Sequence, residues 1–280
     1  MVARRIEKTE TGCRPSQWFG EWAILPEALQ SYLATIQAAD IKALSAAPAG
    51  PAPQAYTVSA EGLATINITG PIAKYGSSFQ SLIGGASTLE KRQALRQAVR
   101  DPEVSAIMLR IDSPGGTVSG TGDLADAIAR ADAAKPVYAY IEDLGASAAY
   151  RLASRARKVY ANADAQGGSI GTYTVLTDTS GAYAKEGVKV TVVRSGAFKG
   201  AGEEGTAVTD EQVAEAQRRV DALNQQFLND VSVGRRMPME KVRTLADGRV
   251  HMAAAAKGLG LIDGVASLEE AGRKVMEEVA

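Results

Sequence analysis

The chain has 280 residues, 45% of them hydrophobic, 5% aromatic, and a formal net charge of -1 at pH 7. This length and aliphatic content predict a globular protein with one large domain or two small ones. The balanced net charge gives no electrostatic footprint for nucleic acid or an anionic membrane, so we expect protein or peptide partners. No stretch approaches the roughly 20 apolar residues of a membrane span, and no apolar leader follows the first basic residues. We therefore predict a cytoplasmic protein without a membrane anchor.

Residues 1–55 are predicted to form an appendage to a catalytic body over residues 56–280. A polar segment, 1–17, is followed by one amphipathic helix within 18–44, with its body over 25–44 and Pro26 in the first turn. The Pro/Ala-rich run SAAPAGPAPQ, residues 45–54, predicts a linker. Two interpretations of the aromatic residues before the helix stay open: they anchor a partner, or they hold the helix against its own domain or a neighbouring subunit. These residues are Trp18, Phe19 and Trp22.

From residue 56 onward, strand and helix patterns alternate along the chain. Such repeats predict parallel strand pairing with right-handed crossovers, and hence an α/β fold with helices layered on a sheet. The predicted strands are two within 56–72, then 105–112, 135–142, 158–162, 172–178 and 189–196, and the predicted helices are 87–103, 120–134, 146–156, 181–187 and 209–235.

The predicted strand 105–112 runs directly into SPGG, residues 113–116. Gly115 and Gly116 allow a tight turn with free backbone N–H groups, which is one way to build half of an oxyanion hole. An ordinary turn between a strand and a helix explains the same residues.

Ser147 lies in GASAAY, between a predicted strand and a predicted helix. Small neighbours leave room for a peptide carbonyl to reach the hydroxyl, and free N–H groups at a helix start favour a developing negative charge. If the turn resembles a nucleophile elbow, the N–H of Ala148 is a second oxyanion donor. Small residues also serve close helix packing, so the segment has a purely structural interpretation as well.

The choice of general base is narrow because the sequence holds one histidine and one cysteine. His251 lies far beyond Ser147, in a charged stretch typical of a surface, and Cys13 precedes the folded body. Thiol catalysis, disulfides and a Cys/His metal site are therefore not expected, and no cofactor is predicted. A lysine remains as the base.

Lys199 lies in the glycine-rich segment VVRSGAFKGAGEE. A lone lysine on a loop is usually solvated, so its role depends on its surroundings. To accept a proton, its amine must be neutral near neutral pH, which requires burial and no carboxylate close by. Glu203 and Glu204 must then point away in the working site.

Five segments occur in the order and spacing of the S49 peptidases, the family of signal peptide peptidase A and the phage prohead proteases. This resemblance, which covers nearly all of residues 60–270, implies a fold of the ClpP/crotonase superfamily. It also implies that Ser147 is the nucleophile, Lys199 the general base, Ser169 the residue that positions the lysine, and the Gly115–Gly116 turn part of the oxyanion hole. Single-domain relatives form closed rings, so the resemblance implies a homo-oligomer. The segments are IDSPGG (111–116), GASAAY (145–150), QGGSIGTY (166–173), RSGAFKGAG (194–202) and ADGRVHMAAAAKGLGLID (246–263).

The sequence departs from the membrane-bound members of this family, since it has no N-terminal anchor and one catalytic domain rather than two in tandem. WAILPEALQ followed by a Pro/Ala linker resembles phage-encoded members, which predicts a prohead protease that processes scaffold or capsid proteins. Three alternatives remain: a soluble bacterial enzyme that degrades signal peptides or other fragments, a crotonase-type acyl-CoA enzyme, and an inactive assembly module.

Overall fold

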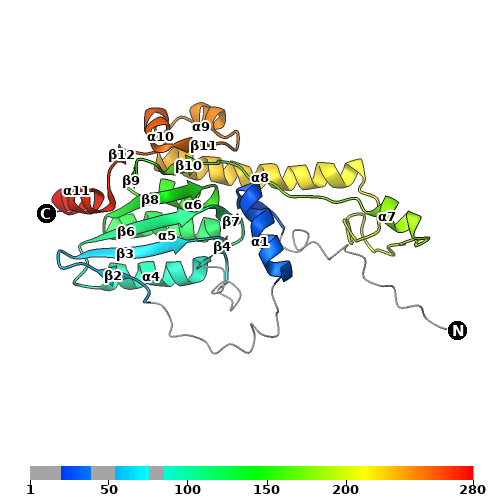
Figure 1. Ribbon diagram of the computed structural model, residues 1–280, viewed down its shortest axis with the longest axis horizontal. Helices are drawn as coiled ribbons and strands as arrows, with labels where there is room; N and C mark the ends of the chain where they lie inside the picture. Colours follow the sequence, from blue (N-terminus) through cyan, green and yellow to red (C-terminus); the bar gives the residue numbers. More distant parts are fainter. Residues whose placement is uncertain (1–19, 39–53, 76–84, 280) are drawn as a thin grey trace.

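Two sheets and the helices around them make up the described part of the chain, which comprises residues 20–38, 54–75 and 85–279 of this computed structural model (Figure 1). Cys13, Trp18, Phe19, the end of the predicted N-terminal helix and nearly all of the predicted linker lie outside these ranges. The division between an appendage and a catalytic body at residue 55 therefore stays a prediction.

The larger sheet contains the predicted parallel core. Its strands follow the order β11-β10-β8-β6-β3-β2, and β9 pairs with β8 and β12. The pairs β3–β6, β6–β8, β8–β9 and β8–β10 are parallel, which confirms the α/β class. The strands are β2 (Thr57–Val58), β3 (Leu63–Thr69), β6 (Ala106–Ser113), β8 (Val137–Ala146), β9 (Lys158–Ala161), β10 (Gln166–Gly168), β11 (Val250–Met252) and β12 (Gly264–Val265).

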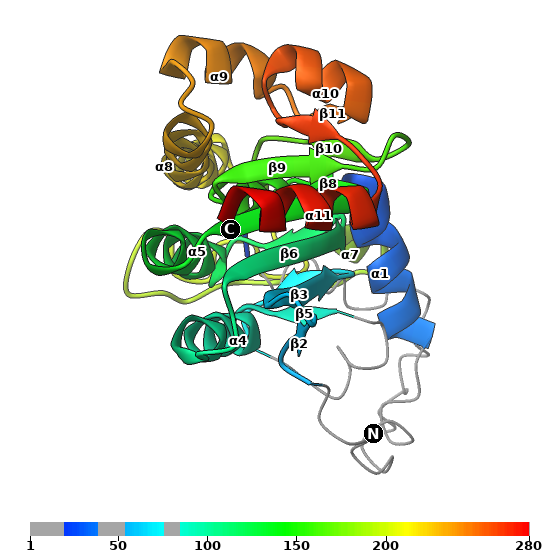
Figure 2. The same cartoon turned by 90° about the vertical axis from the view of Figure 1, so that its left-hand side faces the viewer.

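Helices cover both faces of this sheet (Figure 2). Side chains alternate along β6: Ile107 and Leu109 pack beneath α4, α5 and α6, whereas Met108 belongs to a separate apolar cluster with Val275 of α11. Burial on two faces explains why strand 105–112 reads as a continuous apolar run. The helices are α4 (Thr88–Arg100), α5 (Thr121–Ala134), α6 (Ala148–Ser154), α8 (Asp210–Gly234), α9 (Met239–Leu245), α10 (Ala253–Leu259) and α11 (Leu268–Val279).

Local sequence sets the ends of these helices. The Ser87 hydroxyl accepts the N–H of Glu90 at the start of α4, and Thr209 and Gln212 form a capping box at the start of α8. The predicted long helix 209–235 is thereby confirmed. None of the helices that the structure describes is long and apolar enough to cross a lipid bilayer.

A smaller sheet of order β1-β7-β4-β5 holds the SPGG turn. Its first strand, β1 (Trp22–Ile24), is fully buried and pairs antiparallel with β7 (Gly115–Thr117), and β4 (Ile72–Ala73) pairs with β7 on the other side. The sequence predicted no strand before the N-terminal helix, but residues 22–24 form one, whereas α1 (Pro26–Ala38) is helical as predicted. A strand of three residues is too short to show a period. Residues 22–24 thus belong to the sheet that holds the glycine turn. The remaining strand of this sheet, β5, is Ala86–Ser87.

Residues 174–208 run away from both sheets as an extended arm that carries α7 (Ser180–Lys185) (Figure 1). The predicted strands 172–178 and 189–196 are wrong, because in this region only Tyr173 forms a bridge, with Trp22. The β-branched residues of 189–193 favour an extended backbone, but no strand of the described chain lies beside them to complete a ladder.

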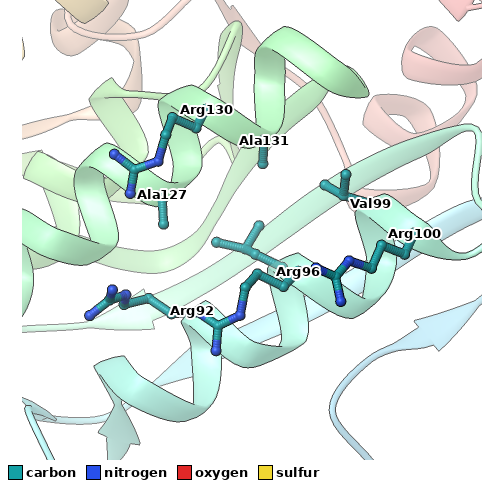
Figure 3. Close-up of a pocket in the computed structure, with 8 residues that line it drawn as sticks. Arg92, Arg96, Val99, Arg100, Ala127, Arg130 and Ala131 are labelled. Carbon is teal, nitrogen blue, oxygen red and sulfur yellow. The ribbon is translucent and has the colours of Figure 1, made fainter.

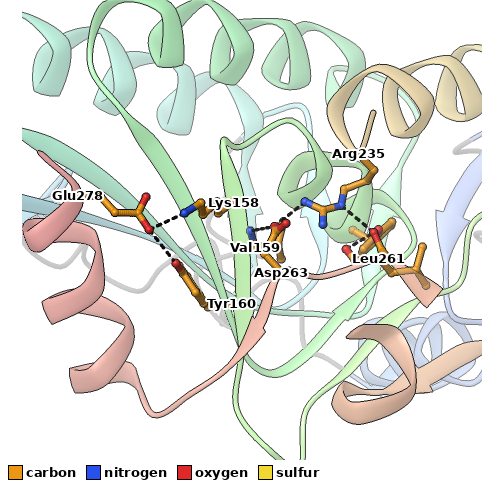
Figure 4. A network of polar contacts seen from close by, with 9 residues as sticks. Lys158, Val159, Tyr160, Arg235, Leu261, Asp263 and Glu278 are labelled. Carbon is orange, nitrogen blue, oxygen red and sulfur yellow. Dashed lines mark hydrogen bonds and ion pairs between the residues drawn. The ribbon is translucent and has the colours of Figure 1, made fainter. Parts of the chain in front are cut away.

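Ion pairs and hydrogen bonds fasten the C-terminal elements to β9 (Figure 4). Glu278 of α11 accepts from Lys158 at 2.6 Å and from Tyr160 at 3.3 Å. Asp263 accepts the N–H of Val159 and a guanidinium N–H of Arg235, both at 2.7 Å. These contacts join α11 and Asp263 to β9.

Candidate active site

Ser147 occupies a strained turn between β8 and α6. Its backbone has φ 55° and ψ -118°, a conformation that a residue with a side chain adopts only where its surroundings enforce it. The Ser147 N–H donates to the carbonyl of Gly168 at 2.8 Å, and its own carbonyl accepts the N–H of Arg151 at 2.9 Å. The residue is 1% exposed. Backbone contacts on both sides therefore fix where its hydroxyl points, as in a nucleophile elbow.

Ser169 lies beside Ser147 because of strand register. Gly168 of β10 pairs in parallel with Ala146 of β8, so the next residue of each strand falls at the same sheet edge. Ser169 also has a positive φ, 50°, and its N–H donates to the carbonyl of Arg249 at 2.7 Å. The Ser147 hydroxyl lies 3.5 Å from the carbonyl oxygen of Gly171, too far for a strong bond, so its proton is not committed to a partner.

The glycine turn of β7 packs directly against the turn that holds Ser147. A Cβ at Gly115 would stand 2.2 Å from the carbonyl oxygen of Ala23 and 3.0 Å from that of Ala146, and one at Gly116 would stand 1.9 Å from the carbonyl oxygen of Ile72. Only glycine fits at these positions. The Gly115 N–H donates to the Ser113 hydroxyl at 3.2 Å.

Ala148 supplies a backbone donor immediately after Ser147. Ala148 is fully buried at the start of α6, where a helix leaves its first N–H groups without partners inside the helix. Its N–H has no acceptor among the residues that the structure describes.

The two serines line one pocket of about 380 Å³. Sequence reasoning missed one wall of it, the polar residues Gln217, Asp221 and Asn224 of α8. Asn224 Oδ1 is buried without a hydrogen-bond partner in the described ranges. A polar residue every three or four positions along α8 was the available signal, but only packing shows which helix face meets the serine. The remaining lining residues are Ile24, Pro26, Ile170, Gly171, Thr172, Tyr173, Val220, Ala246, Asp247 and Gly248.

The pocket has one carboxylate with an altered acidity. Hydrogen bonds from the Arg249 side chain and N–H lower the pKa of Asp247 to about 2, so this group is a carboxylate at every working pH. On the opposite side, burial raises the pKa of the Tyr173 phenol to about 12, so it stays protonated. The pocket therefore carries a fixed negative charge at Asp247, whereas the Tyr173 hydroxyl is buried and has no hydrogen-bond partner among the described residues.

His251 lies closer to the site than the sequence suggested. It belongs to β11, opposite Gly167 of β10, and its Nε2 is buried without a partner among the described residues. Its ring approaches Gly168, since a Cβ there would be 3.3 Å from His251 Cδ2. His251 is nevertheless absent from the residues that line the pocket.

Lys199 lies on the arm and not beside Ser147. It is exposed on the arm, in a turn where its N–H donates to the carbonyl of Gly196 at 3.0 Å, and it does not line the pocket of Ser147. Apolar side chains beside it are also exposed, Val193 at 96% and Phe198 at 51%. Within one chain, the described structure brings Ser147, Ser169, Gly115 and Ala148 together but leaves the predicted base apart. No group of three metal-ligating side chains occurs in the described ranges.

Comparison with known proteins gives the family. Residues 129–280 match the sequence model of peptidase family S49. The chain is 32% identical over 202 residues to the capsid assembly protease C of Escherichia phage lambda, covering 72% of this chain and 46% of that one. It is 33% identical over 172 residues to the head-tail preconnector protein GP5 of Enterobacteria phage P21, covering 61% of this chain and 34% of that one. The chain belongs to peptidase family S49, and it spans less than half the length of these two phage relatives.

The fold also has similarity to solved structures. The ClpP protease catalytic domain from Plasmodium falciparum superposes with a TM-score of 0.46 at 13% identity, over 73% of this chain and 86% of that one.

Proposed function

We propose that this protein is a serine endopeptidase in which Ser147 is the nucleophile and Lys199 the general base. The observation that carries the proposal is the Ser147 turn: a buried serine with positive φ, a hydroxyl without a strong partner, and an unused N–H next to it on Ala148. Membership of a peptidase family supports this function over acyl-CoA chemistry or a purely structural role.

In the proposed reaction, Ser147 Oγ attacks the scissile carbonyl carbon while its proton passes to the neutral amine of Lys199. The Ala148 N–H stabilises the resulting oxyanion, and loss of one such donor typically costs about 2.7 to 4 kcal/mol of transition-state stabilisation. The protonated lysine then gives its proton to the leaving amine as the C–N bond breaks. Water hydrolyses the acyl-enzyme by the same route in reverse.

Two neighbouring groups assist in this scheme. The Ser169 hydroxyl accepts from the ammonium and donates to the neutral amine, so it positions the lysine in both states. The Gly115–Gly116 turn supplies a second oxyanion donor. Because the Gly115 N–H is bonded to Ser113, its use requires that bond to be exchanged when substrate enters.

A homo-oligomer would supply the lysine to the serine. Lys199 stands on an arm whose apolar side chains are exposed, and two copies that exchange such arms would bury Phe198 and Val193 while bringing the amine to a neighbouring pocket. This arrangement removes water from the amine, as its role requires.

For substrates, we propose scaffold or capsid proteins of an immature phage head, processed in the host cytoplasm. The similarity to the capsid assembly protease C of phage lambda supports this choice. Ile24, Ile170 and Val220 give the pocket apolar walls, which favour small or aliphatic side chains next to the cleaved bond. No cofactor is required by this chemistry.

A mixing experiment tests the site and the assembly together. Ser147→Ala and Lys199→Ala should each be inactive on a peptide substrate, and the two proteins, mixed and allowed to exchange subunits, should regain activity because hybrid sites contain both groups. Sedimentation should show an oligomer at micromolar concentration. A fully active monomer would contradict the assembly, and an active Ser147→Ala protein would contradict the nucleophile.

A further inference from the structure

A groove between α4 and α5 carries an unusual concentration of arginine side chains (Figure 3). Arg92, Arg96 and Arg100 follow one another at four-residue spacing along α4, and Arg130 faces them from α5. The groove has a volume of about 280 Å³ and shares no lining residue with the Ser147 pocket. It is therefore a separate surface feature.

Most of these arginines lack a carboxylate partner. Arg92 pairs with Asp123 at 3.2 Å, but Arg96, Arg100 and Arg130 are exposed and make no ion pair with any described residue. Nε of Arg92 is buried and has no acceptor in the same ranges. Most other described arginines pair with a carboxylate, as in Arg110–Glu142, Arg151–Asp230, Arg157–Asp132, Arg218–Glu215 and Arg235–Asp263. The groove thus has an uncompensated positive charge.

The floor of the groove is apolar. Leu95 and Ala131 are buried there, and Val99 and Ala127 are partly exposed between the charged side chains. Figure 3 shows Ala127 and Ala131 of α5 facing α4. A ligand in this groove would therefore meet an apolar strip flanked by guanidinium groups.

We propose that this groove binds an acidic, partly apolar segment of a partner protein. Guanidinium groups form paired hydrogen bonds with carboxylates, and an apolar floor rewards side-chain methylene and methyl groups. Nucleic acid fits less well, because a phosphate backbone gains nothing from Leu95 and Val99, and the chain has a net charge of -1. This proposal does not depend on the peptidase activity.

The spacing of the arginines indicates the form of the ligand. Residues four apart on a helix lie about 6 Å apart along its axis, so Arg92, Arg96 and Arg100 form a row parallel to the groove. A helix with carboxylates at every fourth position and leucines on the adjacent positions presents a matching row. Such a segment would lie along α4, with its leucines over Ala127 and Val99.

The probe for the test is a fluorescent synthetic helical peptide with glutamates at every fourth position and leucines beside them. Its binding to the full chain is measured by anisotropy, at low and at moderate salt. The variant Arg96→Glu/Arg130→Glu reverses one charge on each helix, and Arg243→Glu/Lys257→Glu is the matched control with the same change of net charge on exposed residues of α9 and α10. Ala127→Trp fills the floor and leaves every arginine in place.

We expect the double groove variant to weaken peptide binding about tenfold or more, and the control variant to bind as the parent does. Ala127→Trp should weaken binding as well, because the indole ring would occupy the space that the leucines of the peptide need. All four side chains of the two double variants are exposed, so far-ultraviolet circular dichroism and thermal melting should match the parent. Equal binding by the groove variant, or an equal loss in the control, would overturn the proposal.

Two further outcomes would also overturn it. Unchanged binding to Ala127→Trp means that the peptide is held by charge alone and not in the groove. A duplex DNA of equal charge that binds more tightly than the peptide, and that loses affinity in the Arg96→Glu/Arg130→Glu variant, assigns the surface to nucleic acid instead. Ser147 and Lys199 are intact in every variant. Hydrolysis of a short peptide, measured in parallel, therefore tests the proposed peptidase activity independently of binding to the groove.

Discussion

The Ser147 turn and the arm that carries Lys199 differ in nearly every physical respect. Ser147 is buried, and strands β8 and β10 and helix α6 hold its backbone. The arm, residues 174–208, is largely exposed and has only a short helix of its own. One half of the proposed site is therefore built by the chain's own core, whereas the other half lies on an exposed arm that the described structure does not bring to Ser147.

Hydrogen bonding sharpens this contrast. Around Ser147, the carbonyls of Gly168 and Arg249 accept the N–H groups of Ser147 and Ser169, in bonds between elements far apart in the sequence. On the arm, the backbone hydrogen bonds near Lys199 are those of local turns, such as Lys199 N–H to the Gly196 carbonyl and Ala201 N–H to the Phe198 carbonyl. Local turns do not fix the direction of a segment, so the position of the amine depends on what the arm contacts.

The largest expected effect is loss of activity when either Ser147 or Lys199, the two proposed catalytic residues, is replaced. Ser147→Ala and Lys199→Ala should each lower kcat/KM about a thousandfold or more, and the double variant should be no worse than either, because members of one catalytic unit fail together. Steady-state kinetics on a peptide substrate give the comparison.

His251→Ala is the critical control for this experiment, because His251 lies near Gly168 with an unpartnered Nε2. It should keep most of the parent activity. A His251→Ala enzyme as inactive as Ser147→Ala would replace the lysine with the histidine as base.

The next effect concerns the anchoring of α6 beneath Ser147. Arg151, which is 5% exposed, pairs with Asp230 of α8 at 2.6 Å. Arg151→Ala should lower the free energy of unfolding by an amount at the low end of about 3 to 5 kcal/mol, because it removes the nearer partner of the partly buried Asp230 carboxylate and leaves only Arg155, at 3.8 Å. Urea denaturation followed by circular dichroism measures this. Arg218→Ala, which breaks an exposed ion pair, should cost less than about 1 kcal/mol.

A smaller effect tests whether the N-terminal strand supports the glycine turn. The Leu25 N–H donates to the carbonyl of Pro114, directly before Gly115, at 3.0 Å. Leu25→Pro removes this donor and should cost about 1 to 3 kcal/mol of unfolding free energy together with part of kcat. Leu25→Ala keeps the N–H and should retain more activity. Equal kinetics in the two variants would show that β1 is not needed to hold the turn.

Truncation from the N-terminus extends this test. The sequence predicts residues 1–55 as an appendage to the catalytic body, but β1 pairs with β7, and Ile24 and Pro26 line the pocket. We now expect a chain that begins at Gly20 to keep peptide cleavage and one that begins after residue 50 to lose it.

The smallest effect is the pH dependence of the working enzyme. Only a neutral amine accepts the serine proton, so kcat/KM should rise through a single ionisation between about pH 7 and 9. Asp247, with a pKa of about 2, stays ionised throughout this window and adds no step of its own. A kcat/KM that does not change with pH across this window would contradict the assignment of Lys199 as the general base.

Much of the fold could be predicted because the central strands and helices carry clear periodic patterns. β6, α5 and α8 lie within a few residues of their predicted bounds, since continuous apolar runs, helical spacing and capping residues are local signals. β1 was missed because three residues have no period, and the two strands predicted on the arm do not form because a strand needs a neighbour as well as a propensity.

By itself, the sequence determined which residue types are available for catalysis: one histidine, one cysteine, and serines and a lysine in glycine-rich segments. Only the tertiary structure decided that Ser147 and Ser169 share one sheet edge, that the N-terminal strand lies against Gly115 and Gly116, and that Lys199 stands apart on an exposed arm. The reason is that propensity and spacing act over a few neighbouring residues, whereas register, burial and the partner of an exposed segment depend on contacts between residues far apart in the chain or on different chains.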